Sequence, residues 1–221
     1  MNIFLPLILL LLVLKTGAEI WLSLLNRKRV LEEAGDVPSA YRDFIDEPTY
    51  DKSVSYTLAK NKIEVMETLY DAGILAVILL SGILPWLWTT GTGLLGNGVW
   101  GQAGSLFLVF TILGLTGIPF EWYRQFRLEE RFGFNKSSIG LWIVDKIKGT
   151  LVGAALGIPA LAFLVWLVGL TQFWWLWGFA GFVVFQLLMV VLYPMFILPL
   201  FNKFEELPEG SLRKRLMELG D

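Results

Sequence analysis

The residues of this chain that could do chemistry are carboxylates and cations, because the sequence holds no histidine and no cysteine. The commonest general base and the commonest protein metal ligand are therefore missing, and disulfides are excluded. The sequence also contains no HExxH metal motif, no G-x-S-x-G nucleophile elbow and no phosphate-binding loop. We predict no catalytic residue and no metal ligand within these 221 residues.

Three acids, Glu64, Glu67 and Asp71, recur at helical spacing and could in principle coordinate a cation. A solvated helix entrance explains the same pattern and is the favoured interpretation. Glu129 and Glu130 are adjacent, so on a helix they point to different faces and cannot form an acid–base dyad together. The carboxylates therefore give no pair with a recognisable catalytic spacing.

Lys15 and Glu19 are charged residues inside an apolar stretch, at i, i+4 spacing on one helix face. Such charges either face the interior of a helix bundle or a water-filled cavity, or extend to the membrane interface. Both readings stay open. Asp145 and Lys148 lie at the start of another apolar stretch, where an acid suits the positive end of a helix dipole.

A charged and aromatic segment, 121–149, lies between two tracts without any charge. Residues 72–120 and 149–202 contain no Asp, Glu, Lys or Arg. The whole chain is 55% hydrophobic and 17% charged, with a mean hydropathy of +0.61. A bilayer core about 30 Å thick requires about 20 apolar residues per helix. Each uncharged tract can therefore hold two membrane helices and a connection.

The sequence predicts an all-α, polytopic membrane protein with a helical cytoplasmic loop between its third and fourth spans. The five predicted spans are about residues 3–25, 63–88, 105–121, 148–170 and 174–201. The glycine-rich stretch 89–104 is predicted to be a flexible connection. That prediction also explains Gly91–Gly96, a formal match to the dinucleotide fingerprint that lacks the required strand and acid.

Lysine and arginine are distributed unevenly along the chain. Of the 18, seven lie in residues 26–62, six in 121–148 and four in 202–221. The positive-inside rule then places the charged loops and the C-terminal tail in the cytoplasm and the N-terminus outside. The net charge of −2 gives no global basic field, so nucleic acid is not an expected partner.

The segment from Arg131 to Asn135 is the most specific part of the charged region. Gly133 is expected to supply a turn, and Phe132 and Phe134 are expected to anchor it on apolar surface. Asn135 or Ser137 is expected to cap a new helix that begins near Ser137. An Asp46-Glu47-Pro48 helix start is predicted earlier in the chain.

The run LEERFGFNK, followed by Asp145-Lys146-Ile147-Lys148-Gly149, resembles the N-terminal membrane region of the type I CAAX prenyl proteases. Other segments agree in order along nearly the whole chain. They are Asp46-Glu47, Lys52-Ser53, Tyr56–Lys60, Tyr193-Pro194, Pro199–Phe204 and Leu207–Leu212. These proteases are integral-membrane zinc endopeptidases that remove the C-terminal tripeptide of prenylated substrates.

The resemblance implies a helical membrane barrel around a water-filled chamber, formed by residues 1–202. Residues 203–221 would begin the catalytic region, whose HExxH zinc site has no counterpart in this sequence. Zinc is thus expected in a full-length enzyme and not on this chain. Candidate residues for the chamber or for the interface with the missing catalytic domain are Lys15, Glu19, Glu129, Arg131, Phe132, Gly133, Phe134, Asn135, Asp145, Lys148 and Asn202.

The expected partners are the lipid bilayer, the catalytic domain and protein or peptide substrates. The expected compartment is the bacterial inner membrane, or the endoplasmic reticulum in a eukaryote. A complete, non-catalytic membrane scaffold or interaction module is the alternative function. Permeation is disfavoured, because the charges lie on one side and form no path through the bilayer.

Overall fold

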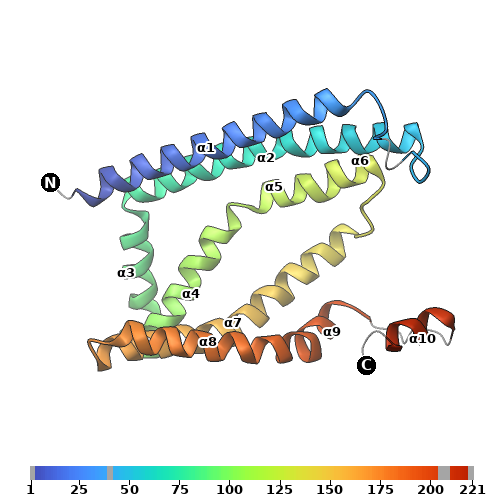
Figure 1. Cartoon of the computed structure of the whole chain (residues 1–221). Coiled ribbons are helices and arrows are strands. Elements are labelled where there is room, and N and C mark those ends of the chain that lie inside the picture. Colours follow the sequence, from blue (N-terminus) through green and yellow to red (C-terminus); the bar gives the residue numbers. More distant parts are fainter. Residues whose placement is uncertain (1–2, 39–41, 204–209, 219–221) are drawn as a thin grey trace. The chain divides into compact units, whose positions relative to one another are not determined.

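The computed structural model describes residues 3–38, 42–203 and 210–218, and every regular element among them is a helix (Figure 1). The predicted all-α fold is therefore confirmed. The chain divides into two compact units, Met1–Trp142 and Ile143–Asp221. Resemblance segments that fall in residues 204–209 lie outside the described residues.

The first unit begins with two long helices, α1 (Phe4–Glu33) and α2 (Glu47–Ser81), which lie side by side (Figure 1). Asp46 caps α2 by accepting a hydrogen bond from the Thr49 amide, as the predicted helix start requires. The buried Asn61 amide of α2 donates to the Ser23 carbonyl at 3.2 Å and to its hydroxyl at 2.6 Å. This polar contact ties the two helices together.

Helices α3 (Ile83–Leu95) and α4 (Val99–Leu115) form a tight helical hairpin. The prediction of a flexible connection over 89–104 is wrong, because only 96–98 are non-helical. Its glycines allow close helix packing instead. A Cβ on Gly91 would lie 3.0 Å from the Ser105 side chain, and one on Gly101 would overlap the Gly96 carbonyl.

A bent helical segment closes the first unit. It consists of α5 (Ile118–Tyr123), the π-helical turn η2 (Arg124–Glu129) and α6 (Glu130–Phe132). The segment bends by 45° from α4, and α3 bends by 68° from α2. Gly82 lies at the bend between α2 and α3 with φ +73°, a conformation that favours glycine.

The second unit contains most of α7 (Ile139–Leu170), together with α8 (Trp174–Leu192), the π-helical turn η3 (Tyr193–Ile197), α9 (Leu198–Phe201) and α10 (Ser211–Glu218). Pro194 lies within η3 and has no N–H to donate, which explains the local widening of the helix. The chain leaves the helix at Asn202, whose backbone is extended.

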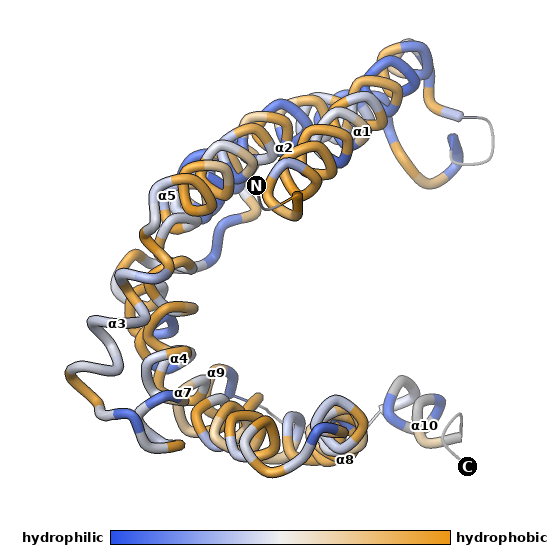
Figure 2. The backbone as a smooth tube through the Cα atoms, turned by 90° about the vertical axis from the view of Figure 1, so that its left-hand side faces the viewer, coloured by the Kyte–Doolittle hydropathy of each residue, from blue (hydrophilic) through white to orange (hydrophobic). Residues whose placement is uncertain are grey.

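Five candidate membrane spans result if each bent helix pair is one span. Helices Phe4–Glu33, Ile139–Leu170 and Trp174–Phe201 qualify singly, and the two bent pairs qualify together. Figure 2 shows apolar residues along the N-terminal part of α1 and along α8. Helix α1 continues past the end of the predicted span 3–25, and α7 begins before the predicted span 148–170. The spans were predicted from apolar composition, whereas helical backbone hydrogen bonds continue into the neighbouring polar sequence.

Candidate functional site

Tyr56 is the centre of a contact cluster in the first unit. The cluster joins α2 to the segment 118–137, which comprises α5, η2, α6 and the connection that leads to α7. The Tyr56 hydroxyl donates to Glu129 Oε1 at 2.6 Å. Its ring meets those of Phe132 and Phe134 edge to face, with centroids 5.2 Å and 5.1 Å apart, a preferred aromatic geometry. The structure therefore brings three predicted residues, Glu129, Phe132 and Phe134, onto one tyrosine that the sequence analysis had named only within a resemblance segment.

The Tyr56 phenol lies in the polar first half of α2, ahead of the uncharged tract. Its pKa is raised above the ordinary value of 10.0, first by the hydrogen bond to Glu129 and then by burial and the Glu129 charge. Each of these disfavours the phenolate. Tyr56 therefore serves as a hydrogen-bond donor at physiological pH.

Gly133 ends α6 in a left-handed conformation, with φ +76°. Its amide donates to the Glu130 carbonyl at 3.1 Å, and the Phe134 amide donates to the Glu129 carbonyl at 2.9 Å. This pair of bonds is the Schellman motif, in which glycine is favoured. The expected turn at Gly133 is confirmed, and it directs Phe134 back onto Tyr56.

Asn135 holds the connection between α6 and α7 through three hydrogen bonds. Its Oδ1 accepts from Gln125 Nε2 at 2.6 Å and from the Ser137 amide at 2.9 Å. Its Nδ2 donates to Glu130 Oε2 at 2.8 Å. Asn135 therefore fixes the backbone before α7.

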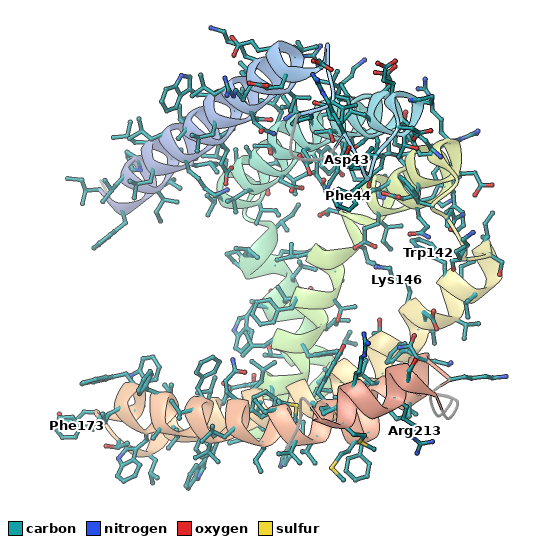
Figure 3. The ribbon with its side chains drawn as sticks, turned by 45° about the vertical axis from the view of Figure 1, so that its right-hand side comes forward. Asp43, Phe44, Trp142, Lys146, Phe173 and Arg213 are labelled. Atoms are coloured by element: carbon teal, nitrogen blue, oxygen red, sulfur yellow. The ribbon has the colours of Figure 1, made fainter. Side chains whose placement is uncertain are left out.

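The cap of α7 differs from the prediction. Helix α7 begins at Ile139, and Ser138 caps it by accepting the Leu141 amide at 3.2 Å. Neither Asn135 nor Ser137 takes this position. The Asn135 side chain instead accepts the Ser137 amide, within the turn that precedes the helix. Trp142, labelled in Figure 3, follows in the first turns of α7, and its ring meets Phe126 edge to face at 5.9 Å.

Arg124 forms a second link between α2 and the segment 118–137 by pairing with Glu67. The two side chains are 39% and 24% exposed, so solvent only partly screens the pair. Glu67 belongs to the acidic series that a cation could have used, and the structure gives it an arginine instead. Local sequence does not indicate this ion pair, because its two residues are 57 positions apart.

Lys15 and Glu19 lie in a different place, a hollow of about 350 Å³ between α1 and α2. Glu64, Glu67 and Asp71 also line this hollow. Lys15 Nζ lies 2.9 Å from Glu19 Oε2, and the two side chains are 67% and 45% exposed. An ion pair this open contributes at most about 1 kcal/mol, so its role is local polarity within an apolar helix.

The predicted residues Asp145, Lys148 and Asn202 belong to the second unit. Lys148 Nζ donates to the Leu200 carbonyl at 3.1 Å, which places a cation at the C-terminal end of α9. Asn202 follows α9, and its amide donates to the Leu198 carbonyl at 3.0 Å. One oxygen of Asp145 is buried and has no hydrogen-bond partner among the described residues.

Arg131 is exposed, with its guanidinium 5.7 Å from the centroid of the Phe132 ring. The acids offer no metal site in the part of the chain that the structure describes: no group of three or more His, Cys, Asp or Glu could hold a metal ion there. The geometry of this region is that of a braced structural element, with α2 as its support.

A family model described as the N-terminal region of CAAX prenyl protease, with five membrane helices, matches residues 27–203. The chain belongs to this family. The match covers all of α2, the segment 118–137, and α7 to α9. The resemblance stated from ERFGFN and its companion segments is confirmed, as is the five-helix membrane fold.

Named relatives agree with this membership. The CAAX prenyl protease 1 of Saccharomyces cerevisiae is 32% identical over 196 residues, covering 84% of this chain and 43% of the relative. The Caenorhabditis elegans homolog is 33% identical over 185 residues, covering 82% of this chain and 40% of the relative. The chain therefore spans less than half the length of either.

A solved structure extends the likeness to three dimensions. The crystal structure of S. mikatae Ste24p matches with a TM-score of 0.88 and 28% sequence identity. The match covers 97% of this chain and 51% of that chain. The helices of this CAAX prenyl protease N-terminal region thus follow the fold of about half of a longer protein.

Proposed function

We propose that this chain forms the membrane part of a zinc-dependent CAAX prenyl protease-like endopeptidase acting on prenylated or membrane-associated proteins. The observation that carries the proposal is the match of residues 27–203 to the five-helix N-terminal region of CAAX prenyl proteases. The likeness of fold to Ste24p over 97% of the chain supports it. In this role the helices form the wall of a membrane chamber.

Zinc does not fit the residues of this chain. A catalytic zinc takes three protein ligands, drawn mostly from histidine, cysteine and carboxylate. The sequence has neither histidine nor cysteine, and the described acids form no suitable cluster. We therefore place the zinc ligands and the catalytic residues outside these 221 residues and expect the chain alone to be inactive.

The segment 118–137 would act as the docking surface for the catalytic region. Two links brace it on α2, Tyr56 with Glu129 and Arg124 with Glu67. Exposed residues, including Arg131 and Phe134, remain available on it. Gly133 and Asn135 shape this surface. Within the second unit, Asp145, Lys148 and Asn202 would make their own contact with the catalytic region. Lys15 and Glu19 would line the chamber.

A peptidase assay tests the proposal. The 221-residue chain, purified in detergent micelles, is incubated with a farnesylated peptide ending in a CAAX sequence, with added zinc or with 1,10-phenanthroline. We expect no cleavage under either condition. The protein encoded by the uninterrupted gene, if it extends past Asp221 with an HExxH motif, is expected to cleave the peptide and to be inhibited by the chelator.

Metal-dependent cleavage by the 221 residues alone would overturn the assignment of catalysis to another region. A stop codon directly after Asp221 would instead support the second candidate, a non-catalytic membrane scaffold. The high exposure of apolar side chains over α8, which a bilayer or a partner would cover, is compatible with both. In either case the positive-inside rule predicts a cytoplasmic C-terminus.

A further inference from the structure

A groove of about 510 Å³ lies between α2 and the segment 118–137, entirely within the first unit. Its floor is apolar. Ile63 and Leu128 on this floor are buried and belong to one hydrophobic cluster with Phe132. Phe120 packs against the same cluster, and Met66 is an exposed apolar residue along the groove.

Three cations, Lys62, Arg127 and Arg131, line this groove, and none of its lining residues among those that the structure describes is an acid. All three are exposed, and within the described ranges none lies within 4.0 Å of a carboxylate. The two guanidinium groups lie 5.8 Å and 5.7 Å from aromatic ring centroids, those of Trp122 and Phe132. Stacking of this kind steadies an arginine while its in-plane N–H donors point away from the ring.

The groove lies where the polar and apolar parts of the sequence meet. Lys62 immediately precedes the predicted span 63–88, about three helical turns before the uncharged tract 72–120 begins. Pro119 and Phe120 are the last residues of that tract. In a bilayer, a groove at this level would have its floor near the acyl chains and its cations near the headgroups. The lysine and arginine distribution predicts the cytoplasmic side, where anionic lipids are concentrated.

We propose that this groove binds one anionic phospholipid from the cytoplasmic leaflet. The phosphate would contact Lys62, Arg127 and Arg131, and the upper part of one acyl chain would cover the floor around Ile63 and Met66. A zwitterionic lipid fits less well, because its own ammonium group is repelled by the three cations. The proposal goes beyond the peptidase assignment and does not depend on it.

Lipid retention tests the proposal directly. The 221-residue chain is purified in detergent with an equimolar mixture of phosphatidylglycerol and phosphatidylcholine, and bound lipid is measured by native mass spectrometry. The wild-type chain is expected to retain phosphatidylglycerol in preference to phosphatidylcholine. The triple variant Lys62→Gln, Arg127→Gln, Arg131→Gln is expected to retain at least tenfold less phosphatidylglycerol, because each basic residue near an anionic lipid contributes about fivefold in affinity.

A charge-matched control separates a site from general attraction. The variant Arg27→Gln, Lys28→Gln, Lys60→Gln loses the same charge at residues that do not line the groove. It is expected to retain phosphatidylglycerol like the wild type. An equal loss in both triple variants would refute a specific site. A charge-preserving variant, Lys62→Arg with Arg127→Lys and Arg131→Lys, is expected to keep most of the binding.

Two measurements on the wild-type chain remain decisive even if the neutralised variant does not fold. A photoreactive acyl chain on phosphatidylglycerol is expected to label Ile63, Met66, Phe120 or Leu128, and labelling confined to other helices would contradict the proposal. Glycerol 1-phosphate in excess is expected to leave the lipid bound. Displacement by this soluble phosphate would show that the groove is a free-phosphate site.

Discussion

Single residues in the segment 118–137 act by fixing the positions of their neighbours. Gly133 shows this most clearly, because its left-handed backbone is needed for the two Schellman hydrogen bonds that end α6. The turn places Phe134 against Tyr56, and the Tyr56 hydroxyl bonds to Glu129, four residues before Gly133. Gly133 and Tyr56 together thus hold the end of α6 against α2.

Replacing Tyr56 by phenylalanine is expected to destabilise the first unit by about 1 kcal/mol, because the ring contacts remain while Glu129 loses its hydrogen-bond donor. Thermal unfolding in detergent, followed by circular dichroism, measures the loss. Thr57→Val, which removes a hydroxyl that bonds only within α2, is the matched control and is expected to change stability less. Equal effects would mean that the Glu129 contact is not stabilising.

The same variant carries a pH signature. The folded pKa of Tyr56 is raised above 10.0, so its contribution to stability is present below pH 10 and is lost as the pH rises through the folded value. The stability difference between wild type and Tyr56→Phe is therefore expected to shrink in strongly alkaline solution. A difference that grows above pH 10 would contradict the assigned direction.

At the scale of the elements, the sequence predicted the helices well and their ends less well. Runs without charge, such as 149–202, indicate membrane helices because lipid excludes charge and requires internal backbone hydrogen bonds. Helix ends depend on capping contacts, and Ser138 rather than Asn135 or Ser137 caps α7 because Asn135 bonds elsewhere. Composition alone does not contain that choice.

The glycine-rich stretch 89–104 shows a second limit of sequence reasoning. Glycine favours turns, but it also allows two helices to approach closely in a membrane. The structure uses it in the second way, with Gly91 beside Ser105 in the hairpin of α3 and α4. The difference depends on which residues face each other across the hairpin, which no local pattern specifies.

Two glycines of this hairpin are expected to respond differently to alanine. A Cβ at Gly101 overlaps the carbonyls of Leu95 and Gly96, whereas one at Gly93 meets nothing within 4 Å. Gly101→Ala is therefore expected to cost about 1–3 kcal/mol through overpacking. Gly93→Ala is expected to be neutral or slightly stabilising, because alanine is the better helix former. Thermal unfolding of the two variants in the same detergent compares them, and equal stabilities would rule out close packing at Gly101.

At the scale of the whole molecule, the chain is a membrane domain whose apolar side chains remain widely exposed, among them Leu187 and Val190 at 66% and 73%. Such surface requires lipid or a partner to cover it. Family membership was predictable because the ERFGFN segment is a distinctive run of six consecutive residues. The contact that braces this segment on α2 was not predictable, because Tyr56 and Glu129 are 73 residues apart and no local pattern pairs them.

The proposed docking role of the segment 118–137 makes a prediction for a catalytically complete relative of this chain. Replacing the residue that matches Asn135 by leucine removes the bonds to Gln125, Glu130 and the Ser137 amide while keeping the same branched side-chain skeleton. Because small misplacements near a catalytic centre can cost about 100-fold in rate, we expect at least a tenfold loss of peptidase kcat with the helical content unchanged.

The control for that experiment is the position of Lys28, an exposed residue of α1 outside the segment 118–137, for which glutamine is expected to leave kcat unchanged. Measuring kcat and KM separately is informative. Impaired docking lowers the fraction of assembled catalytic centres and so lowers kcat, whereas the centres that do assemble keep their substrate affinity and KM stays unchanged. Unchanged kcat in the leucine variant, at wild-type thermal stability, would reduce this segment to an ordinary connection. A loss of kcat that follows the loss of thermal stability would point to folding alone and would equally contradict a docking role.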